Sequence, residues 1–334
     1  MNQPTTILSR NLPLDVAFGG RTPAERIVAR LDAIEARLIA GDVLGGMQDL
    51  IDSLRVARSE LPLEEWRDLS AEVILKHRIA DVLFQCPLTR RSNTKPRGYA
   101  GDAELLDHIY GLGAATGAPH PATLAGQIYF YTVNSPACRA VRRRREILGA
   151  EIDKAAAAAA PRKPDILSIA CGHLREAELS NAVQAGDVGR FVALDQDEES
   201  LEVVEREYSA LAVEAQTGTV RSIIARKSVF ENMDFVYAAG LYDYLADPIA
   251  VRLIERMYEF LRPGGRLLIA NFTPAGPDVG YMETFMDWWL IFRRREDMRS
   301  LFSTLPDGAK QSLEIFEDEA GTIVYAVISK PSED

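Results

Sequence analysis

Two short turns that follow apolar runs carry residues suited to binding a ribose-containing cofactor. The first apolar run leads into Ala170-Cys171-Gly172, where the glycine lets the backbone approach a ligand closely. The second run ends in Asp195-Gln196, roughly 20 residues beyond Gly172, and an acid there can accept hydrogen bonds from both ribose hydroxyls. We therefore expect Ala170, Cys171, Gly172, Asp195 and Gln196 to bind a cofactor. The alternative is an ordinary strand-to-helix turn followed by a loop acid.

A third turn could hold the reacting groups. Another apolar run ends in Ala239-Gly240, whose backbone we expect to lie beside the cofactor. Tyr242, Asp243 and Tyr244 follow at once, where hydroxyl and carboxylate groups could contact an acceptor. We expect Tyr242 and Asp243 to be catalytic and Tyr244 to bind the substrate, with at least one of the two tyrosines serving as a core residue.

A basic segment over residues 89–102 contains Lys95, Arg97 and Tyr99 among glycines. Such a segment could fold over a site as a lid, and an arginine offers a bidentate fork to a carboxylate. We expect Arg97 and Tyr99 to be catalytic and Lys95 to bind the substrate. The competing interpretation is a solvated basic loop containing a turn.

Two adjacent tryptophans, Trp288 and Trp289, cannot share one face of a helix. We expect one of them to be a core residue and Trp288 to line an apolar acceptor pocket. The arginine runs at residues 142–145 and 293–295 are expected to be solvated or ion-paired faces.

The composition limits the classes of partner. The 334 residues carry 38 basic and 49 acidic side chains, a net charge of -11, which disfavours nucleic-acid binding. The three cysteines are too sparse for a disulfide framework, and neither they nor the four histidines show metal-ligand spacing, so we expect no metal site. We find no transmembrane segment or signal peptide and expect a cytoplasmic location. No feature indicates the oligomeric state.

The elements that position these residues change character along the chain. We expect an arm at residues 1–20, a helical domain at 21–162 that includes the lid at 89–102, and a cofactor-binding domain at 163–334. In the last part, apolar runs alternate with helical stretches, which predicts an α/β domain with a mostly parallel sheet.

Five strands are expected in this sheet, followed by an antiparallel hairpin within residues 311–330. Their ranges are 165–170, 190–195, 219–224, 233–240 and 264–272. A parallel sheet that ends in such a hairpin is typical of class I S-adenosylmethionine (SAM) methyltransferases. The segment around Gly172 resembles the first motif of these enzymes, although Ser168 replaces the usual acid and Ala170 and Leu174 replace glycines.

Four segments resemble a narrower bacterial family, the methyltransferases that make 3-hydroxypalmitic acid methyl ester, an extracellular signalling factor. They are KPRGYAGD (95–102), SIACGHLRE (168–176), AAGLYDYL (238–245) and YMETFMDWWLIFR (281–293). The resemblance covers about residues 85–330. It implies SAM as cofactor and a small or fatty-acid-like acceptor whose carboxylate becomes a methyl ester.

Two other functions remain open from the residues alone. An N- or O-methyltransferase of a small metabolite would use a general base such as Asp243 or His173. A non-catalytic SAM-binding module would keep Gly172 and Asp195 without turnover. A nicotinamide oxidoreductase is disfavoured because no G-x-G-x-x-G follows the first strand.

Overall fold

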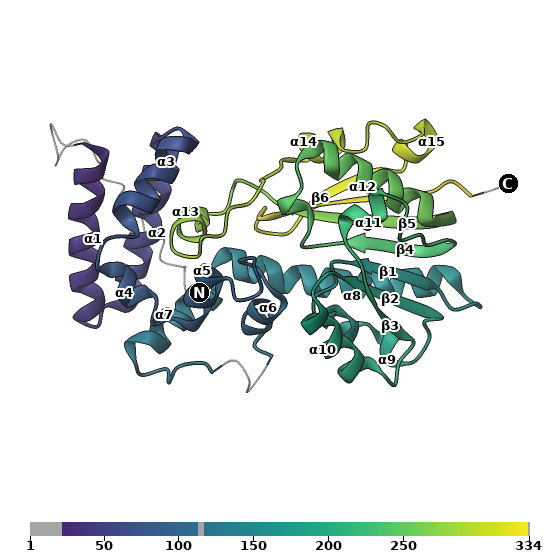
Figure 1. The fold of residues 1–334 in the computed structure, drawn as a ribbon, viewed down its shortest axis with the longest axis horizontal. Helices are drawn as coiled ribbons and strands as arrows, with labels where there is room; N and C mark the ends of the chain where they lie inside the picture. Colours follow the sequence, from purple (N-terminus) through teal and green to yellow (C-terminus); the bar gives the residue numbers. More distant parts are fainter. Residues whose placement is uncertain (1–21, 113–116, 333–334) are drawn as a thin grey trace, which may run out of the picture.

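The computed structural model describes residues 22–112 and 117–332 (Figure 1). The arm predicted at residues 1–20 lies outside the described residues. Helices precede the sheet, and the domain boundary that we propose near residue 162 lies between α8 and β1. The helical region contains α1 (Pro23–Ile39), α2 (Val43–Glu60), α3 (Leu63–Leu69), the π-helix η2 (Ser70–Ile74), α4 (Ile79–Leu83), α5 (Pro87–Thr94), α6 (Ala103–Tyr110), α7 (Leu124–Val133) and α8 (Pro136–Ala159).

The α/β region follows in the order that the alternating pattern predicts. Its elements are β1 (Asp165–Ile169), η4 (Arg175–Leu179), α9 (Asn181–Gln184), β2 (Arg190–Asp195), α10 (Glu198–Tyr208), β3 (Val213–Thr217), α11 (Val220–Ile224), β4 (Met233–Ala238), η5 (Tyr242–Tyr244), α12 (Asp247–Phe260), β5 (Leu261–Phe272), α13 (Val279–Thr284), α14 (Arg295–Ser300), α15 (Asp307–Lys310), β6 (Glu314–Glu317) and β7 (Ile323–Ser329).

In the described part of the chain, seven strands form one sheet in the order β3-β2-β1-β4-β5-β7-β6. Strands β1 to β5 pair in parallel, whereas β7 is antiparallel to both β5 and β6. Figure 1 shows α12 and α14 on one side of the strands and α9 and α10 on the other. Alternate residues of a strand face opposite sides, so Ile166 joins the core under α8 and Leu167 the core under α12. The predicted α/β fold class is therefore confirmed.

The strand predicted at residues 219–224 is wrong, because these residues form the short helix α11. The Thr219 hydroxyl accepts a hydrogen bond from the Ser222 amide, and the Ser222 hydroxyl accepts one from the Thr219 amide. The third strand is instead β3, at the edge of the sheet beside β2. Most of its side chains are exposed, so the sequence shows no apolar run there.

Two helical segments of the chain are interrupted. Between Pro62 and Pro87 the chain forms α3, η2 and α4, and in η2 the Leu75 amide bonds to the Ser70 carbonyl five residues earlier, which widens the turn. Residues 175–184 form η4 and α9, which are separated by the extended backbone of Ser180.

The connection from β5 to α14 fastens the helical region to the sheet. Figure 1 shows its helix α13 between the sheet and helices α2 and α3. The buried carboxylate of Glu283 accepts hydrogen bonds from Trp66 Nε1 at 2.7 Å and from Arg58 Nη2 at 2.8 Å. Nearby, the Thr89 and Tyr281 hydroxyls are 2.8 Å apart. This connection therefore packs into the core that the helical region shares with one face of the sheet.

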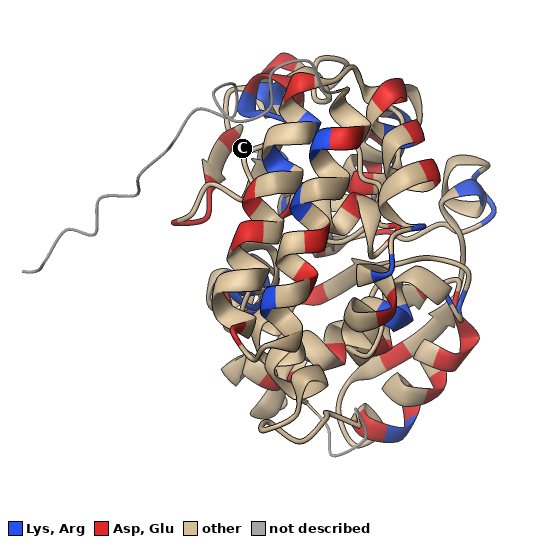
Figure 2. Cartoon of the chain, turned by 90° about the vertical axis from the view of Figure 1, so that its left-hand side faces the viewer, with Lys and Arg blue, Asp and Glu red and all other residues tan. Residues whose placement is uncertain are grey.

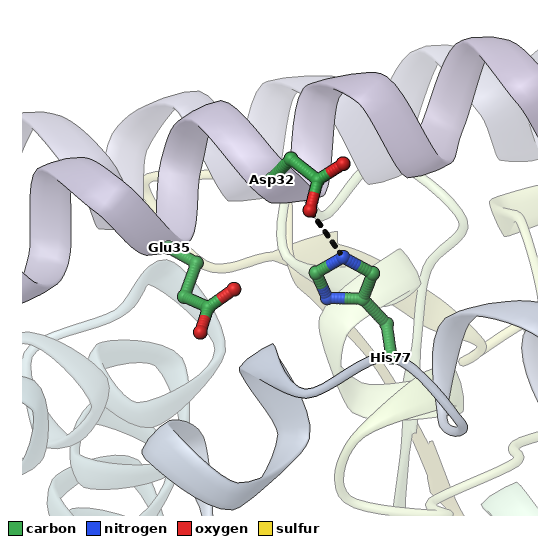
Figure 3. A group of neighbouring side chains, drawn as sticks. All are labelled: Asp32, Glu35 and His77. Atoms are coloured by element: carbon green, nitrogen blue, oxygen red, sulfur yellow. Dashed lines mark hydrogen bonds and ion pairs between the residues drawn. The ribbon is translucent and has the colours of Figure 1, made fainter.

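A cluster of Asp32, Glu35 and His77 has ligand atoms close enough together to suggest a metal site (Figure 3). However, His77 Nδ1 accepts the Ile79 amide hydrogen at 3.1 Å, so the ring proton lies on Nε2, which faces Asp32 Oδ1 at 3.3 Å. Arg78 also pairs with both carboxylates. Arg78 thus compensates one of the two carboxylate charges, and the cluster joins α1 to the turn before α4.

We expect Glu283→Ala to lower the free energy of unfolding by about 2–4 kcal/mol, because Trp66 and Arg58 lose a buried acceptor. Chemical denaturation followed by circular dichroism would measure this loss. The matched control is Asp52→Ala, which removes an exposed ion pair with Arg55 and should change stability little. Equal losses in the two variants would contradict the fastening role.

Candidate active site

A cavity of about 570 Å³ lies between the carboxyl ends of the central strands and the helical region. Its walls come from the ends of β1, β2 and β4, from helices α6 and α8, and from the loop before α6. Ligands bind at this edge in open sheets of this kind. Most of the predicted site residues line this cavity: Arg97, Tyr99, Ala170, Cys171, Gly172, Asp195, Gln196, Ala239, Gly240, Asp243, Tyr244 and Trp288.

Asp195 connects the first two strand ends. Its Oδ2 accepts the Gly172 amide at 2.8 Å, and its Oδ1 accepts the Asp197 amide at 3.0 Å. The side chain is buried, and this burial raises the pKa of its carboxyl group. Each carboxylate oxygen has a second acceptor position, so the group can still receive two hydroxyl donors. This geometry fits the predicted ribose contact.

The turn after β1 is tight and closely covered. Ala170, Gly172 and Leu174 all have positive φ, at 56°, 53° and 52°. A Cβ placed on Gly172 would lie 3.2 Å from Cβ of Ala103, the first residue of α6. Glycine is therefore required here by the approach of the helical region as well as by backbone conformation.

Arg97 lies on the cavity wall but differs from the predicted acceptor anchor. Its Nη1 donates to Asp197 Oδ2 at 2.9 Å and to Ser200 Oγ at 3.0 Å, and Nη2 lies 3.5 Å from Glu199 Oε2. These partners belong to the start of α10, beside Asp195. The guanidinium charge thus ties the segment around Arg97 to the start of α10, at the predicted ribose end of the cavity.

The structure does not bring Lys95 or Tyr242 to the cavity, and we correct both predictions. Lys95 Nζ donates to Asp287 Oδ2 at 2.5 Å. Tyr242 is fully buried under α12, where its hydroxyl contacts Met257 Sδ at 3.3 Å. Tyr242 is accordingly the core tyrosine of the pair, and Tyr244 the one on the cavity wall.

The opposite end of the cavity combines aromatic and acidic groups. The Tyr244 hydroxyl accepts a hydrogen bond from Trp288 Nε1 at 2.7 Å. Gly101 of the lid packs against this pair, since a Cβ there would lie 2.4 Å from Trp288 Cζ2. Asp243 is buried and accepts the Phe272 amide at 2.6 Å, and burial raises the pKa of its carboxyl group to about 6.

His173 is held away from the cavity wall. It is buried, and its Nδ1 lies 2.9 Å from Asp107 Oδ2, which also accepts Arg175 Nη2 at 2.7 Å. The described residues that line the cavity do not include it. The geometry therefore leaves Asp243, and not His173, as the carboxylate or imidazole that could act as a base.

Two charged cavity residues were missed by the sequence reasoning, Arg144 and Glu176. Arg144 belongs to the run expected to form a solvated or ion-paired face. Its neighbours Arg143 and Arg145 do pair with Glu146 and Glu178. Figure 2, which faces the α1 side of the helical region, shows acidic and basic residues interspersed on the helices there as well. The helical spacing from Val141 through Arg144 to Leu148 could have placed Arg144 on the buried face of α8.

Comparison with known proteins identifies the α/β region. Residues 166–265 match the family described as a methyltransferase domain. No curated protein sequence matches the chain. Given this domain match and the sheet topology, the chain is a SAM-dependent methyltransferase. In the described residues, no helix is long and apolar enough to cross a membrane.

Solved structures support the fold. A possible exported protein from Bordetella parapertussis is similar over 93% of this chain and 98% of its own, with a TM-score of 0.59 and 16% identity. N-methyltransferase NodS from Bradyrhizobium japonicum, in complex with S-adenosyl-L-homocysteine, covers 60% of this chain and 90% of its own, with a TM-score of 0.40 and 15% identity. At such identities the first likeness shows the fold alone.

We expect Asp195→Ala to weaken S-adenosylhomocysteine binding by about tenfold or more, because charge-assisted hydrogen bonds to the ribose are lost. Calorimetric titration would measure the affinity, and circular dichroism would verify that the fold is retained. Glu198→Gln changes an exposed acid on the next helix and serves as the control. Unchanged affinity in the Asp195 variant would contradict the prediction that Asp195 binds the ribose hydroxyls.

Proposed function

We propose that this SAM-dependent methyltransferase methylates the carboxylate of a small or fatty-acid-like molecule to a methyl ester. SAM, when bound, supplies a methyl group on a positively charged sulfur. A carboxylate is already ionised at neutral pH, so its methylation needs alignment and exclusion of water but no general base. The chain must therefore orient one carboxylate oxygen without binding it so tightly that it loses nucleophilicity.

The observation that carries this proposal is the hydrogen-bonding state of Tyr244. Because its oxygen accepts the Trp288 indole hydrogen, the hydroxyl hydrogen is available to donate into the cavity. Burial raises the pKa of Tyr244 and of Tyr99, so both hydroxyls stay protonated at neutral pH. A neutral donor can hold one oxygen of an acceptor carboxylate while the other oxygen keeps the electron density that it needs to attack the methyl group.

Apolar side chains surround this end of the cavity and fit the carbon skeleton of such an acceptor. Val141 of α8, Phe272 at the end of β5, Trp288 and Leu290 contribute to the wall. Their burial against a ligand would supply affinity in proportion to the apolar area covered.

A second candidate, methylation of a hydroxyl or amine, is favoured by Asp243. This carboxylate lines the cavity, and with a pKa of about 6 it is mostly ionised at neutral pH. A base with such a pKa could remove a proton from an acceptor that is not already ionised. The same negative charge disfavours an acceptor carboxylate unless a nearby donor compensates it.

Labelled product separates the two candidates. Purified protein would be incubated with methyl-labelled SAM and a panel of hydroxy fatty acids, amino acids and amines. We expect the label to be released as volatile methanol by mild alkali, because esters hydrolyse under these conditions. Label that survives alkali would indicate N- or ether O-methylation. Binding of S-adenosylhomocysteine with no transfer to any acceptor would favour a non-catalytic module.

The pH dependence gives an independent test. Below about pH 6, Asp243 becomes protonated. With a carboxylate acceptor, we expect kcat/KM to stay level or rise from pH 8 to 5.5, because protonation removes a repelling charge. If Asp243 instead acts as the general base, its protonation removes the base, and kcat/KM would fall about tenfold per pH unit below 6.

Asp243→Asn serves as the matched variant, because its amide oxygen can still accept the Phe272 amide. It should retain activity on a carboxylate acceptor. A loss of about 100-fold or more would assign Asp243 as the base.

A further inference from the structure

Arg144 presents a positive charge to the cavity, where this charge also acts on the carboxylates of Asp243 and Glu176. It extends from the middle of α8, is only 6% exposed and lines the cavity wall. Among the described residues Arg144 forms no salt bridge, whereas Arg143 pairs with Glu146 and Arg145 pairs with Glu178. A Cβ on Gly240 would lie 3.6 Å from Arg144 Nη2, so the guanidinium covers the turn at the end of β4.

Glu176 presents the opposite charge to the same cavity. It is 8% exposed, and its Oε1 accepts the Tyr237 hydroxyl at 2.6 Å. Within the described ranges, Glu176 forms no ion pair, and burial raises the pKa of its carboxyl group. The positive charges of Arg144 and Arg145 act on this carboxylate without forming a salt bridge with it among the described residues, and its oxygens retain acceptor capacity for an ammonium group.

The position of Glu176 accounts for the unusual sequence of the first motif. Ser168, which replaces the usual acid, is buried on β1, where it is the register partner of Tyr237 on β4. Tyr237 in turn orients Glu176. The carboxylate that is missing from the strand is thus present in the cavity, supplied by η4 and held by β4.

We propose that Glu176 and Arg144 bind the two charged groups of the amino-acid end of SAM, its α-ammonium and its α-carboxylate respectively. This inference rests on the proposed function only in requiring SAM as the cofactor. Two opposite charges on one wall, beside Gly240 and close to the turn at Gly172, match a zwitterion. They also match its place in the cavity, because Asp195 marks the ribose end.

The proposal gives the helical region a direct part in cofactor binding. Arg144 belongs to α8, before the matched methyltransferase domain at residues 166–265, whereas Glu176 lies within it. The cofactor site is therefore completed by two regions of the chain. Tyr237 acts as a positioning residue, since it reaches the cofactor through Glu176.

The test compares two ligands by calorimetric titration of the full chain. S-Adenosylhomocysteine has the amino-acid end, and 5′-methylthioadenosine lacks it. We expect Glu176→Gln and Arg144→Gln each to weaken S-adenosylhomocysteine binding about ten- to hundredfold, the range for a lost charge-assisted hydrogen bond. Binding of 5′-methylthioadenosine should not change. Arg143→Gln, which alters an exposed neighbour on the same helix, should change neither.

Tyr237→Phe provides a second variant that keeps the buried carboxylate. It should cause a smaller loss that again affects only S-adenosylhomocysteine. Equal losses for both ligands would overturn the proposal and assign a structural role. Unchanged affinity in the Arg144 variant with a raised acceptor KM would also overturn it, because Arg144 would then bind the acceptor. These titrations contain no acceptor, so failure to form a methyl ester would contradict only the carboxylate proposal.

Discussion

The site depends on one connection that fastens the helical region to one face of the sheet. Glu283 is buried between Arg58 and Trp66 of the helical region, while the same connection begins at the end of β5. A buried carboxylate needs partners, and only the packed helical region supplies them here. This constraint fixes Trp288 opposite the strand ends and lets Gly101 pack against it. The cavity wall at Trp288 and Gly101 therefore depends on the buried bonds of Glu283, which lie outside the cavity.

Local sequence patterns are sufficient to predict the position of a residue that directly follows a buried strand. Asp195 and Gly172 follow apolar strands, so their meeting at one edge of the sheet could be predicted. Strand β3 could not, because an exposed edge strand lacks an apolar run. Lys95 was misassigned for a different reason: its partner, Asp287, is distant in sequence, and nothing local indicates which acid a lysine will meet. The same holds for the bond between Arg97 and Asp197, although Arg97 does line the cavity.

Charge burial also explains why the missed residues are informative. Arg144 and Glu176 look like members of ordinary charged helices, yet each faces the cavity, whereas their neighbours Arg143 and Arg175 form ion pairs. Burying such groups is costly unless a partner arrives. Their neighbours in sequence, Arg145 and Arg175, form ion pairs with Glu178 and Asp107. Among the described residues, paired and unpaired charges therefore lie side by side in α8 and in η4. The geometry thus separates the charges that form ion pairs within the fold from the two charges that face the cavity.

The bond between Arg58 and Glu283 spans 225 residues of chain. Helices α2 and α3 are synthesised early, but the acid that satisfies Arg58 and Trp66 arrives only after most of the sheet. Contacts of such sequence separation slow folding, because the intervening chain must be ordered before they form. During synthesis, Arg58 and Trp66 of the early helices therefore lack their buried acceptor. When Glu283 binds them, the helical core and the wall of the cavity that contains Trp288 are completed together.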